Sequence, residues 1–426
     1  MIESAPLSNE SPAPSKAANP RTILIITDPY YPDEVAAGYF ITKIAEGLAQ
    51  NYNVEVLCGQ PNYRTRGIRA PTRETLNGVK IQRLRSTTFS NDSIPLRLIN
   101  IATFALSLFF KAFATLRSRD LVLVVTTPPM LPFVARPACA LRGAKCLLLV
   151  HDVFPEALSA AGLTTPSSWV SKILSRMVRS LYRWMDGIIV IGRDMQKLVS
   201  AKRGPSTKPI AIIPNWADVE EIHPTEGSLN PLLQKLGLAE KFVVQYSGNM
   251  GRTHNLEATL TAAEMLHDDP TIHFLLIGGG KKKRMVEDAL QQRGLTNVTL
   301  LDYQPREQLP VSLNACDIAI IPFVSSMAGI SVPSRMYNVL GSGKPILAVT
   351  EVDSELAMVV VEEQVGWVID PDQPEKIADA IRIARAHPET LAEMGRRARC
   401  AAEEKYTLPH VVRQFDEVVQ RLAHTD

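Results

Sequence analysis

Arginine and glycine residues that suit an anionic ligand follow an apolar run in the second half of the chain. The segment "VVQYSGNMGRTHNLE" contains Gly248, Asn249 and Arg252. A glycine lets a ligand approach the backbone closely, and an arginine presents a fork of donors that matches a diphosphate. A surface arginine near the end of a strand is the alternative. The position directly after a buried run favours anion binding.

Three consecutive glycines, with Gly279 in the middle, end another apolar run in "LLIGGGKKKR". The Walker A spacing GxxxxGK[ST] is absent, and so is GxGxxG between a strand and a helix. The sequence therefore gives no support to a P-loop nucleotidase or an NAD-binding fold. We expect the four cations at 281–284 to form a solvated helix start, with ligand contact as the alternative.

A histidine and two carboxylates follow an apolar run in the first half, in "LLLVHDVFPEA". His151 and Asp152 come at the end of that run, and Glu156 lies four residues beyond Asp152. A histidine there can donate a hydrogen bond or relay a proton at neutral pH. The alternative is a structural histidine whose ring is satisfied by its neighbours. His151 is the candidate catalytic residue.

The stretch "GISVPSRMYNVLGSGKP", residues 329–345, contains no Asp or Glu. Ser334 after Pro333 is suited to cap a short helix, which the glycines at 341 and 343 would end. The amides from Gly329 through Ile330 to Ser331 would then point at an anion. Asn338 lies one turn beyond Ser334 on the same face.

Gly38 lies in "TDPYYPDEVAAGYFITKIAEGLAQ", after the first apolar run and near the start of a helical segment. A glycine at a helix N-terminus lets a phosphate approach free N–H groups. An ordinary turn glycine is the alternative.

Short apolar runs must position all of these residues, and they alternate with helical segments. Most are rich in Val, Ile and Leu throughout, as in parallel strands covered by helices on both faces. The first series is "TILIIT", "VEVLCG", "VKIQRL", "LVLVVTT", "CLLLVHDV", "GIIVIG" and "IAIIPN", and the second is "FVVQYSG", "IHFLLIGGG", "VTLLDY", "IAIIPF", "PILAV" and "GWVID".

The two series predict an α/β chain with two Rossmann-like domains facing each other across a cleft. Ligands of such sheets bind outside the carboxyl ends of the strands, where the residues above lie. The expected division is a disordered tail at 1–20, an N-terminal domain at 21–213, a linker at 214–240, a C-terminal domain at 241–404, and a helix at 405–426 that packs back on the first domain.

The composition agrees with a two-domain globular chain: 426 residues, 46% of them hydrophobic, suit two cores. The 46 Lys and Arg nearly balance the 44 Asp and Glu, so nothing global indicates nucleic-acid binding. The five cysteines are scattered without a CxxC pair, which favours a reducing compartment and argues against a disulfide framework or zinc site. The Ser/Pro/Ala-rich start lacks the apolar segment of a signal peptide.

Five motifs, taken in order, resemble family 4 of the GT-B glycosyltransferases, in its bacterial exopolysaccharide and O-antigen branch. The motifs are "DPYYPDEVAAG", "HDVFPEA", "IIPNWAD", "QYSGNMGRTHNLE" and "VPSRMYNVLGSGKPILAV". The resemblance implies a retaining, generally metal-independent transferase without a cofactor, with a nucleotide-sugar donor in the C-terminal domain and the acceptor in the N-terminal domain.

The resemblance also assigns roles to residues. Gly38 and Arg252 would meet the donor diphosphate, and the backbone near Tyr303 would hold the nucleobase. The amides near Ile330 and Ser331 would meet the sugar and phosphate. His151 would lie at the reacting centre, with Asp152 and Glu156 on the acceptor side.

The family often carries two glutamates eight positions apart, and by alignment these positions are Ile330 and Asn338. An asparagine still offers an acceptor to a sugar hydroxyl, without the charge-assisted bond. Isoleucine leaves no carboxylate nucleophile at the first position. This excludes a double displacement through that residue and leaves front-face attack.

The segment 61–120 is strongly basic, with eleven Lys and Arg against three acids. It includes an apolar stretch near 99–110, about a dozen residues and too short to cross a bilayer, which needs about 20. Basic and apolar together predict peripheral contact with anionic lipid at the inner face of the cell membrane. A core helix with exposed ends is the alternative.

We therefore expect a cytoplasmic, membrane-peripheral retaining glycosyltransferase. It would move a sugar from a nucleotide diphosphate to a lipid-linked or saccharide acceptor in exopolysaccharide or O-antigen synthesis. The alternatives are a GT-B nucleotide-sugar epimerase and a catalytically silent binding subunit of a polysaccharide complex.

Overall fold

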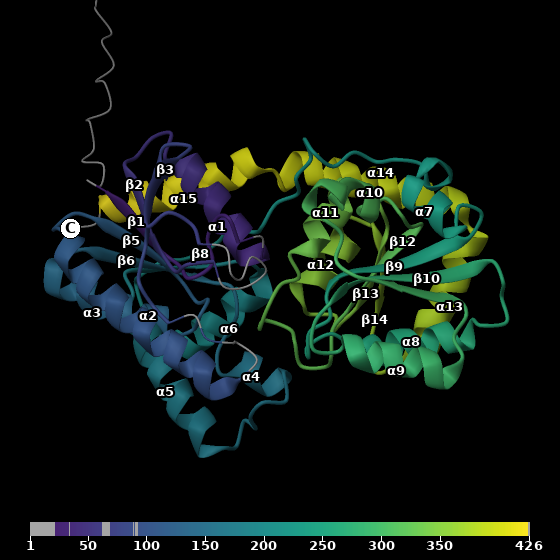
Figure 1. Ribbon diagram of the computed structural model, residues 1–426, viewed down its shortest axis with the longest axis horizontal. Helices are drawn as coiled ribbons and strands as arrows, with labels where there is room; N and C mark the ends of the chain where they lie inside the picture. The colour runs from purple at the N-terminus through teal and green to yellow at the C-terminus, as the bar shows by residue number, and fades with distance from the viewer. Residues whose placement is uncertain (1–21, 34, 62–68, 88, 90–92, 425–426) are drawn as a thin grey trace, which may run out of the picture.

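The computed structural model describes residues 22–424 except 34, 62–68, 88 and 90–92. The expected tail at 1–20 lies outside the described residues. The described chain forms two α/β domains that lie side by side (Figure 1). The predicted pair of Rossmann-like domains is confirmed.

The N-terminal sheet has eight described strands in the order β3-β4-β2-β1-β5-β6-β7-β8. Its central strands are buried along their whole length, as expected of parallel strands covered on both faces. The strands are β1 (Ile23–Ile26), β2 (Val54–Cys58), β3 (Arg73–Leu76), β4 (Val79–Arg83), β5 (Leu121–Val125), β6 (Lys145–Val150), β7 (Gly187–Val190) and β8 (Ile210–Ile212).

Strand β3 is absent from the predicted runs. It pairs antiparallel with β4 at the edge of the sheet, and its residues alternate between exposed and half-buried. An edge strand with the sequence Arg-Glu-Thr-Leu carries no continuous apolar signal. The seven predicted runs all form strands.

Helices cover both faces of this sheet. Helix α1 lies on one side with the C-terminal helix, and α2, α3 and α5 gather on the other (Figure 1). The helices are α1 (Ala36–Leu48), α2 (Ile94–Thr115), α3 (Leu131–Arg142), α4 (Glu156–Ala160), α5 (Trp169–Trp184) and α6 (Arg193–Arg203).

Helix α2 is longer than the apolar stretch that the sequence suggested. It spans 22 residues, and its window Leu98–Thr115 is long and apolar enough to cross a membrane by length and composition. Only 22% of that window is buried. The argument that this segment is too short to span a bilayer was therefore wrong.

The C-terminal sheet is wholly parallel, in the order β11-β10-β9-β12-β13-β14. Its strands are β9 (Phe242–Asn249), β10 (Ile272–Gly279), β11 (Val298–Leu301), β12 (Ile318–Pro322), β13 (Ile346–Val349) and β14 (Gly366–Ile369). Its helices are α8 (Leu256–Met265), α9 (Lys283–Arg293), α10 (Leu309–Leu313), α11 (Arg335–Gly341), α12 (Glu355–Glu362) and α13 (Pro374–Ala386), with the 3-10 turn η2 (Arg306–Gln308). The strand order reverses at β9, between β10 and β12, where ligands of such sheets bind.

The chain passes between the domains twice. The first passage follows β8 and contains the 3-10 turn η1 (Gly227–Leu229) and helix α7 (Pro231–Leu236). The second joins α14 (Pro388–Lys405) to α15 (Leu408–Ala423), which packs against α1 (Figure 1). The Lys145 ammonium donates to the Leu422 carbonyl over 2.8 Å and holds α15 on the first domain.

Candidate active site

The two domains touch where the sequence placed the reacting centre. Asp152, after β6, forms an isolated antiparallel bridge with Ser331 of the C-terminal domain. The Val153 N–H donates to the Ile330 carbonyl over 2.9 Å. Main-chain pairing therefore joins the expected acceptor side directly to the expected donor side.

His151 lies at the carboxyl end of β6, beside this bridge. Its backbone N–H donates to the Thr126 hydroxyl over 3.0 Å, and its ring Nδ1 is buried without a hydrogen-bond partner among the described residues. Burial lowers the pKa of the imidazole to about 4. The ring is therefore neutral at pH 7 and is better suited to orient a hydroxyl than to hold its proton.

The two carboxylates near His151 have different surroundings. Burial raises the pKa of Asp152, and a hydrogen bond from Ser331 opposes that rise. Glu156 opens α4 and pairs with the buried Lys202 ammonium at 2.5 Å. Its Oε1 is therefore engaged within the N-terminal domain, whereas Asp152 faces the domain contact.

Asp194 at the start of α6 holds the donor-side loop from across the domain contact. Its Oδ2 accepts from the Gly329 N–H at 2.8 Å and from the Glu355 N–H at 2.9 Å. The Ile330 N–H donates to the Met327 carbonyl at 3.0 Å. The amides of Gly329 and Ile330, which the sequence directed at an anion, are thus both engaged within the protein.

Helix α11 also differs from expectation. Ser334 occupies the N-cap position with helical backbone angles, and its side chain makes no capping hydrogen bond. The Asn338 Oδ1 accepts from the Asp218 N–H over 3.2 Å, so its acceptor oxygen fastens the interdomain linker. Ser334 thus takes the predicted N-cap position without the capping hydrogen bond that its side chain was expected to make. Asn338 has a partner that the sequence did not reveal.

Three predicted donor-side residues come together at the ends of β9, β10 and β11. The Tyr303 hydroxyl donates to the Gly279 carbonyl over 2.9 Å and lies 3.4 Å from the Asn249 Oδ1. Gly279 and Asn249 are the last residues of their strands rather than the first residues after them. Tyr303 is exposed beside them.

Arg252 lies in the loop after β9, exposed and without a side-chain partner among the described residues. Gly38 is different, because it is buried in the first turn of α1. A Cβ at Gly38 would lie 2.8 Å from the Asp33 carbonyl oxygen. The space beside Gly38 is therefore filled by the preceding loop of the protein and not by a cavity that could take a phosphate.

Arg335, which the sequence reading passed over, occupies the space beside β9. Its Nη2 lies 2.9 Å from the His254 Nε2, and its guanidinium carbon lies 4.7 Å from the centre of the Tyr246 ring. Gly248 has a positive φ of 141°, and a Cβ there would lie 2.9 Å from that carbon. The missing side chain of Gly248 makes room for Arg335. The sequence signal that could have identified Arg335 is an arginine in a stretch without Asp or Glu.

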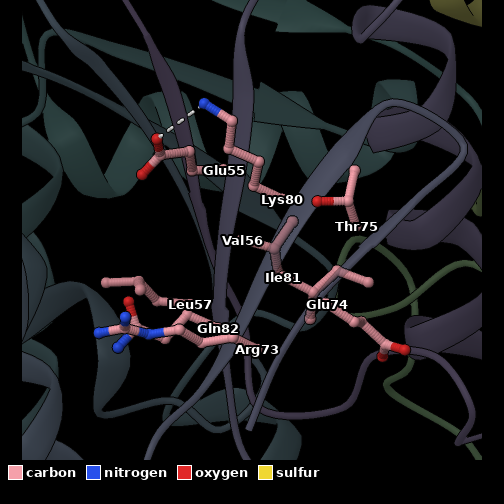
Figure 2. Close-up of a pocket in the computed structure, with 9 residues that line it drawn as sticks. All are labelled: Glu55, Val56, Leu57, Arg73, Glu74, Thr75, Lys80, Ile81 and Gln82. Atoms are coloured by element: carbon pink, nitrogen blue, oxygen red, sulfur yellow. Dashed lines mark ion pairs between the residues drawn. The ribbon is translucent and has the colours of Figure 1, made fainter. Parts of the chain in front are cut away.

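A hollow of about 400 Å³ lies elsewhere, over strands β2, β3 and β4 (Figure 2). Polar side chains line it, among them Glu55 and Lys80, which pair at 3.7 Å. It flanks the edge of the sheet rather than the carboxyl ends of the central strands. Among the described residues no cluster of three or more His, Cys, Asp or Glu could hold a metal.

Two family models match the chain, one to each domain. The model "Glycosyl transferase 4-like domain" matches residues 36–216, and "Glycosyl transferases group 1" matches residues 232–400. Fold and matches define a glycosyltransferase of the two-domain GT-B class. The chain belongs to family 4 of these enzymes.

Two relatives are assigned as glycosyltransferases. The chain is 31% identical over 265 residues to WbjE of Pseudomonas aeruginosa, assigned as a glycosyltransferase, a match that covers 62% of this chain and 66% of WbjE. It is 26% identical over 409 residues to WcaI of Escherichia coli (strain K12), assigned as a colanic acid biosynthesis glycosyl transferase, covering 92% and 98%.

Solved structures share the fold. Sucrose-phosphate synthase of Thermosynechococcus elongatus superposes with a TM-score of 0.77 at 16% identity, covering 94% of this chain and 99% of that one. Anabaena HepE in complex with UDP and glucose superposes with a TM-score of 0.71 at 17% identity, covering 94% and 100%. These likenesses show the fold, and the two family models show that the chain is a glycosyltransferase.

Proposed function

We propose that the chain is a retaining transferase that moves a sugar from a nucleoside diphosphate to a lipid-linked or saccharide acceptor, without metal or cofactor. One observation carries this proposal. The Asp152–Ser331 bridge sets His151 beside the donor-side loop, at the carboxyl ends of both sheets. The HepE structure with UDP and glucose supports a nucleotide sugar as donor.

Front-face attack is the mechanism that these residues favour. The buried Ile330 supplies no carboxylate for a covalent intermediate. Neutral His151 would orient the acceptor hydroxyl, and Arg252 would stabilise the leaving diphosphate. As the bond between the sugar and the diphosphate breaks, the diphosphate would take up the proton of the acceptor hydroxyl. The acceptor oxygen thereby joins the face of the sugar that the diphosphate leaves, which retains the anomeric configuration.

The first test is thermal stabilisation of the protein by UDP, GDP, ADP, CMP and dTDP, with Arg252→Ala as the comparison variant. Ligand that binds only the folded state raises the melting temperature. One nucleotide should stabilise the native protein and lose most of its effect in the variant. Stabilisation by none of them would count against a nucleotide-sugar donor. Chelator should leave transfer unchanged.

We also propose that the protein docks on the inner face of the cell membrane through the helices α2, α3 and α5. These three helices contain eight Lys and Arg and no Asp or Glu. On α2, Phe104, Leu108 and Ala112 are buried, whereas Leu106 and Phe110 are exposed. One face of α2 thus packs inward, which favours a helix that lies on a membrane over one that spans it.

Helix α5 adds a second docking element that the 61–120 segment did not include. Trp169, Val170, Ile173 and Met177 on this helix are exposed, and they alternate with exposed cations. Aromatic and aliphatic side chains enter the interface of a bilayer, and each nearby cation contributes about 1 kcal/mol with anionic lipid. An acceptor carried by a lipid would then reach the cleft from this side.

Sedimentation with vesicles tests the docking surface. Vesicles of phosphatidylglycerol should bind the protein and vesicles of phosphatidylcholine should not. Phe110→Glu and Ile173→Glu should each weaken binding. Ile383→Glu is the matched control, because Ile383 is an exposed aliphatic residue of α13 in the other domain. Equal effects of all three changes would contradict this surface.

A further inference from the structure

Arg335 carries a positive charge that the surrounding protein does not neutralise. Its Nη1 is buried and has no hydrogen-bond partner, and no carboxylate lies within ion-pair distance of it among the described residues. Buried Arg83, by contrast, pairs with Glu74 at 2.5 Å. Arg335 is half-buried, and its only partners among the described residues are the neutral His254 ring and the Tyr246 ring, neither of which carries a negative charge. A guanidinium withdrawn from water without a counter-charge points to an anionic partner that arrives from outside.

The groups around Arg335 do not cancel its charge. His254 accepts from the Arg335 Nη2, and burial followed by the charges of Arg335 and Lys282 lowers its pKa well below the usual range. His254 is therefore neutral and orients the guanidinium. Lys282 donates to the His254 carbonyl at 2.8 Å and pairs with Glu257 at 2.7 Å.

The backbone keeps this space for Arg335. A Cβ at Gly248 would lie 2.9 Å from the guanidinium carbon, too close for the side chain to keep its place. The ring of Tyr246, a residue of β9, packs against the guanidinium at 4.7 Å. The site lies at the carboxyl end of β9, where the strand order of the donor sheet reverses. A planar fork with one spare buried N–H group is suited to an oxyanion.

We propose that Arg335 is a preformed phosphate-binding residue of the donor site, which takes a diphosphate oxygen on its unpartnered Nη1. The proposal rests on the proposed function and deepens it. It also agrees with the absence of acids from helix α11, which carries Arg335: a carboxylate beside Arg335 would neutralise the charge before the ligand arrives.

The test compares a nucleoside diphosphate with its own nucleoside by calorimetry, with the nucleotide that stabilises the native protein. Arg335→Gln should weaken diphosphate binding by about ten- to a hundredfold, the range for hydrogen bonds to charged groups, and leave nucleoside binding within about twofold. Arg335→Lys should recover part of the loss. Arg293→Gln is the matched control, because that arginine lies at the end of α9 and pairs with Glu264.

Two results would overturn the proposal. One is an unchanged diphosphate affinity in Arg335→Gln. The other is an equal loss for diphosphate and nucleoside together with a lowered ligand-free melting temperature, as a structural arginine would give.

Inorganic pyrophosphate separates this proposal from the proposed function. If no nucleoside diphosphate binds and pyrophosphate stabilises the native protein but not Arg335→Gln, the phosphate site stands and the donor assignment fails. If neither binds, both are overturned.

Discussion

The Tyr39 hydroxyl donates to the Asp218 Oδ1 over 2.7 Å and thereby joins the first helix to the linker between the domains. Arg306 of the C-terminal domain pairs with the same carboxylate at 3.1 Å and stacks on the Tyr39 ring at 3.7 Å. Asn338 accepts from the Asp218 backbone. One aspartate thus holds elements of both domains.

Asp218→Ala should lower the free energy of unfolding by about 2–4 kcal/mol, because it leaves a half-buried tyrosine hydroxyl and an arginine without their acceptor. Urea denaturation measures the change. Glu221→Ala is the control, since its exposed carboxylate lies 4.0 Å from Arg306 and should contribute less than about 1 kcal/mol. Similar losses for both variants would contradict the role of Asp218.

Acid should destabilise the protein partly through His151. Its folded pKa of about 4 lies below the usual histidine value of 6.5, so the unfolded chain binds the proton more readily. The contribution of His151 to stability is complete above pH 6.5 and falls as the pH drops towards 4, by up to about 3 kcal/mol. His151→Gln should flatten this dependence in denaturation curves between pH 7 and 4. An unchanged slope would contradict burial of a neutral ring.

Restoring an acid at position 330 should harm the protein rather than supply a nucleophile. Ile330 is buried and its carbonyl accepts from Val153 across the domain contact. Ile330→Glu should lower stability by about 2–4 kcal/mol and reduce transfer, whereas Ile330→Val should cost about 0.5–1.5 kcal/mol. Melting curves and transfer assays check both. Faster transfer in the glutamate variant would show that this position faces the reacting centre.

Gly248→Ala should impair donor binding by displacing Arg335. The new Cβ would lie 2.9 Å from the guanidinium carbon. Gly237→Ala is matched in needing a positive φ, and nothing lies within 4 Å of its Cβ. Both variants should lose about 1 kcal/mol of stability from backbone strain. Only Gly248→Ala should also weaken nucleotide binding, as calorimetry would show.

The sequence predicts the architecture well because the strand signal is local. Buried runs such as those of β5 and β12 are apolar throughout, and each became a strand. The edge strand β3 was not predicted, because it is formed by pairing with β4 and has no apolar run of its own.

The site is harder to predict because its partners are distant in the chain. Nothing near Asn338 in sequence reveals that it accepts from Asp218, 120 residues away. Arg335 and His254 meet across 81 residues. Gly248 was predicted to let a ligand approach the backbone, and in the structure the Arg335 side chain occupies the space beside it. The local sequence pattern predicts where the strands end, and tertiary packing determines which side chains lie beside those ends.

The two passages of chain between the domains are fastened to each other. The Ala217 N–H on the first donates to the Tyr406 carbonyl on the second over 2.8 Å. Two connecting segments that are joined at one place permit a hinge motion of the two domains and resist sliding or twisting of one domain against the other. Each opening would therefore return His151 and the donor-side loop to the same register.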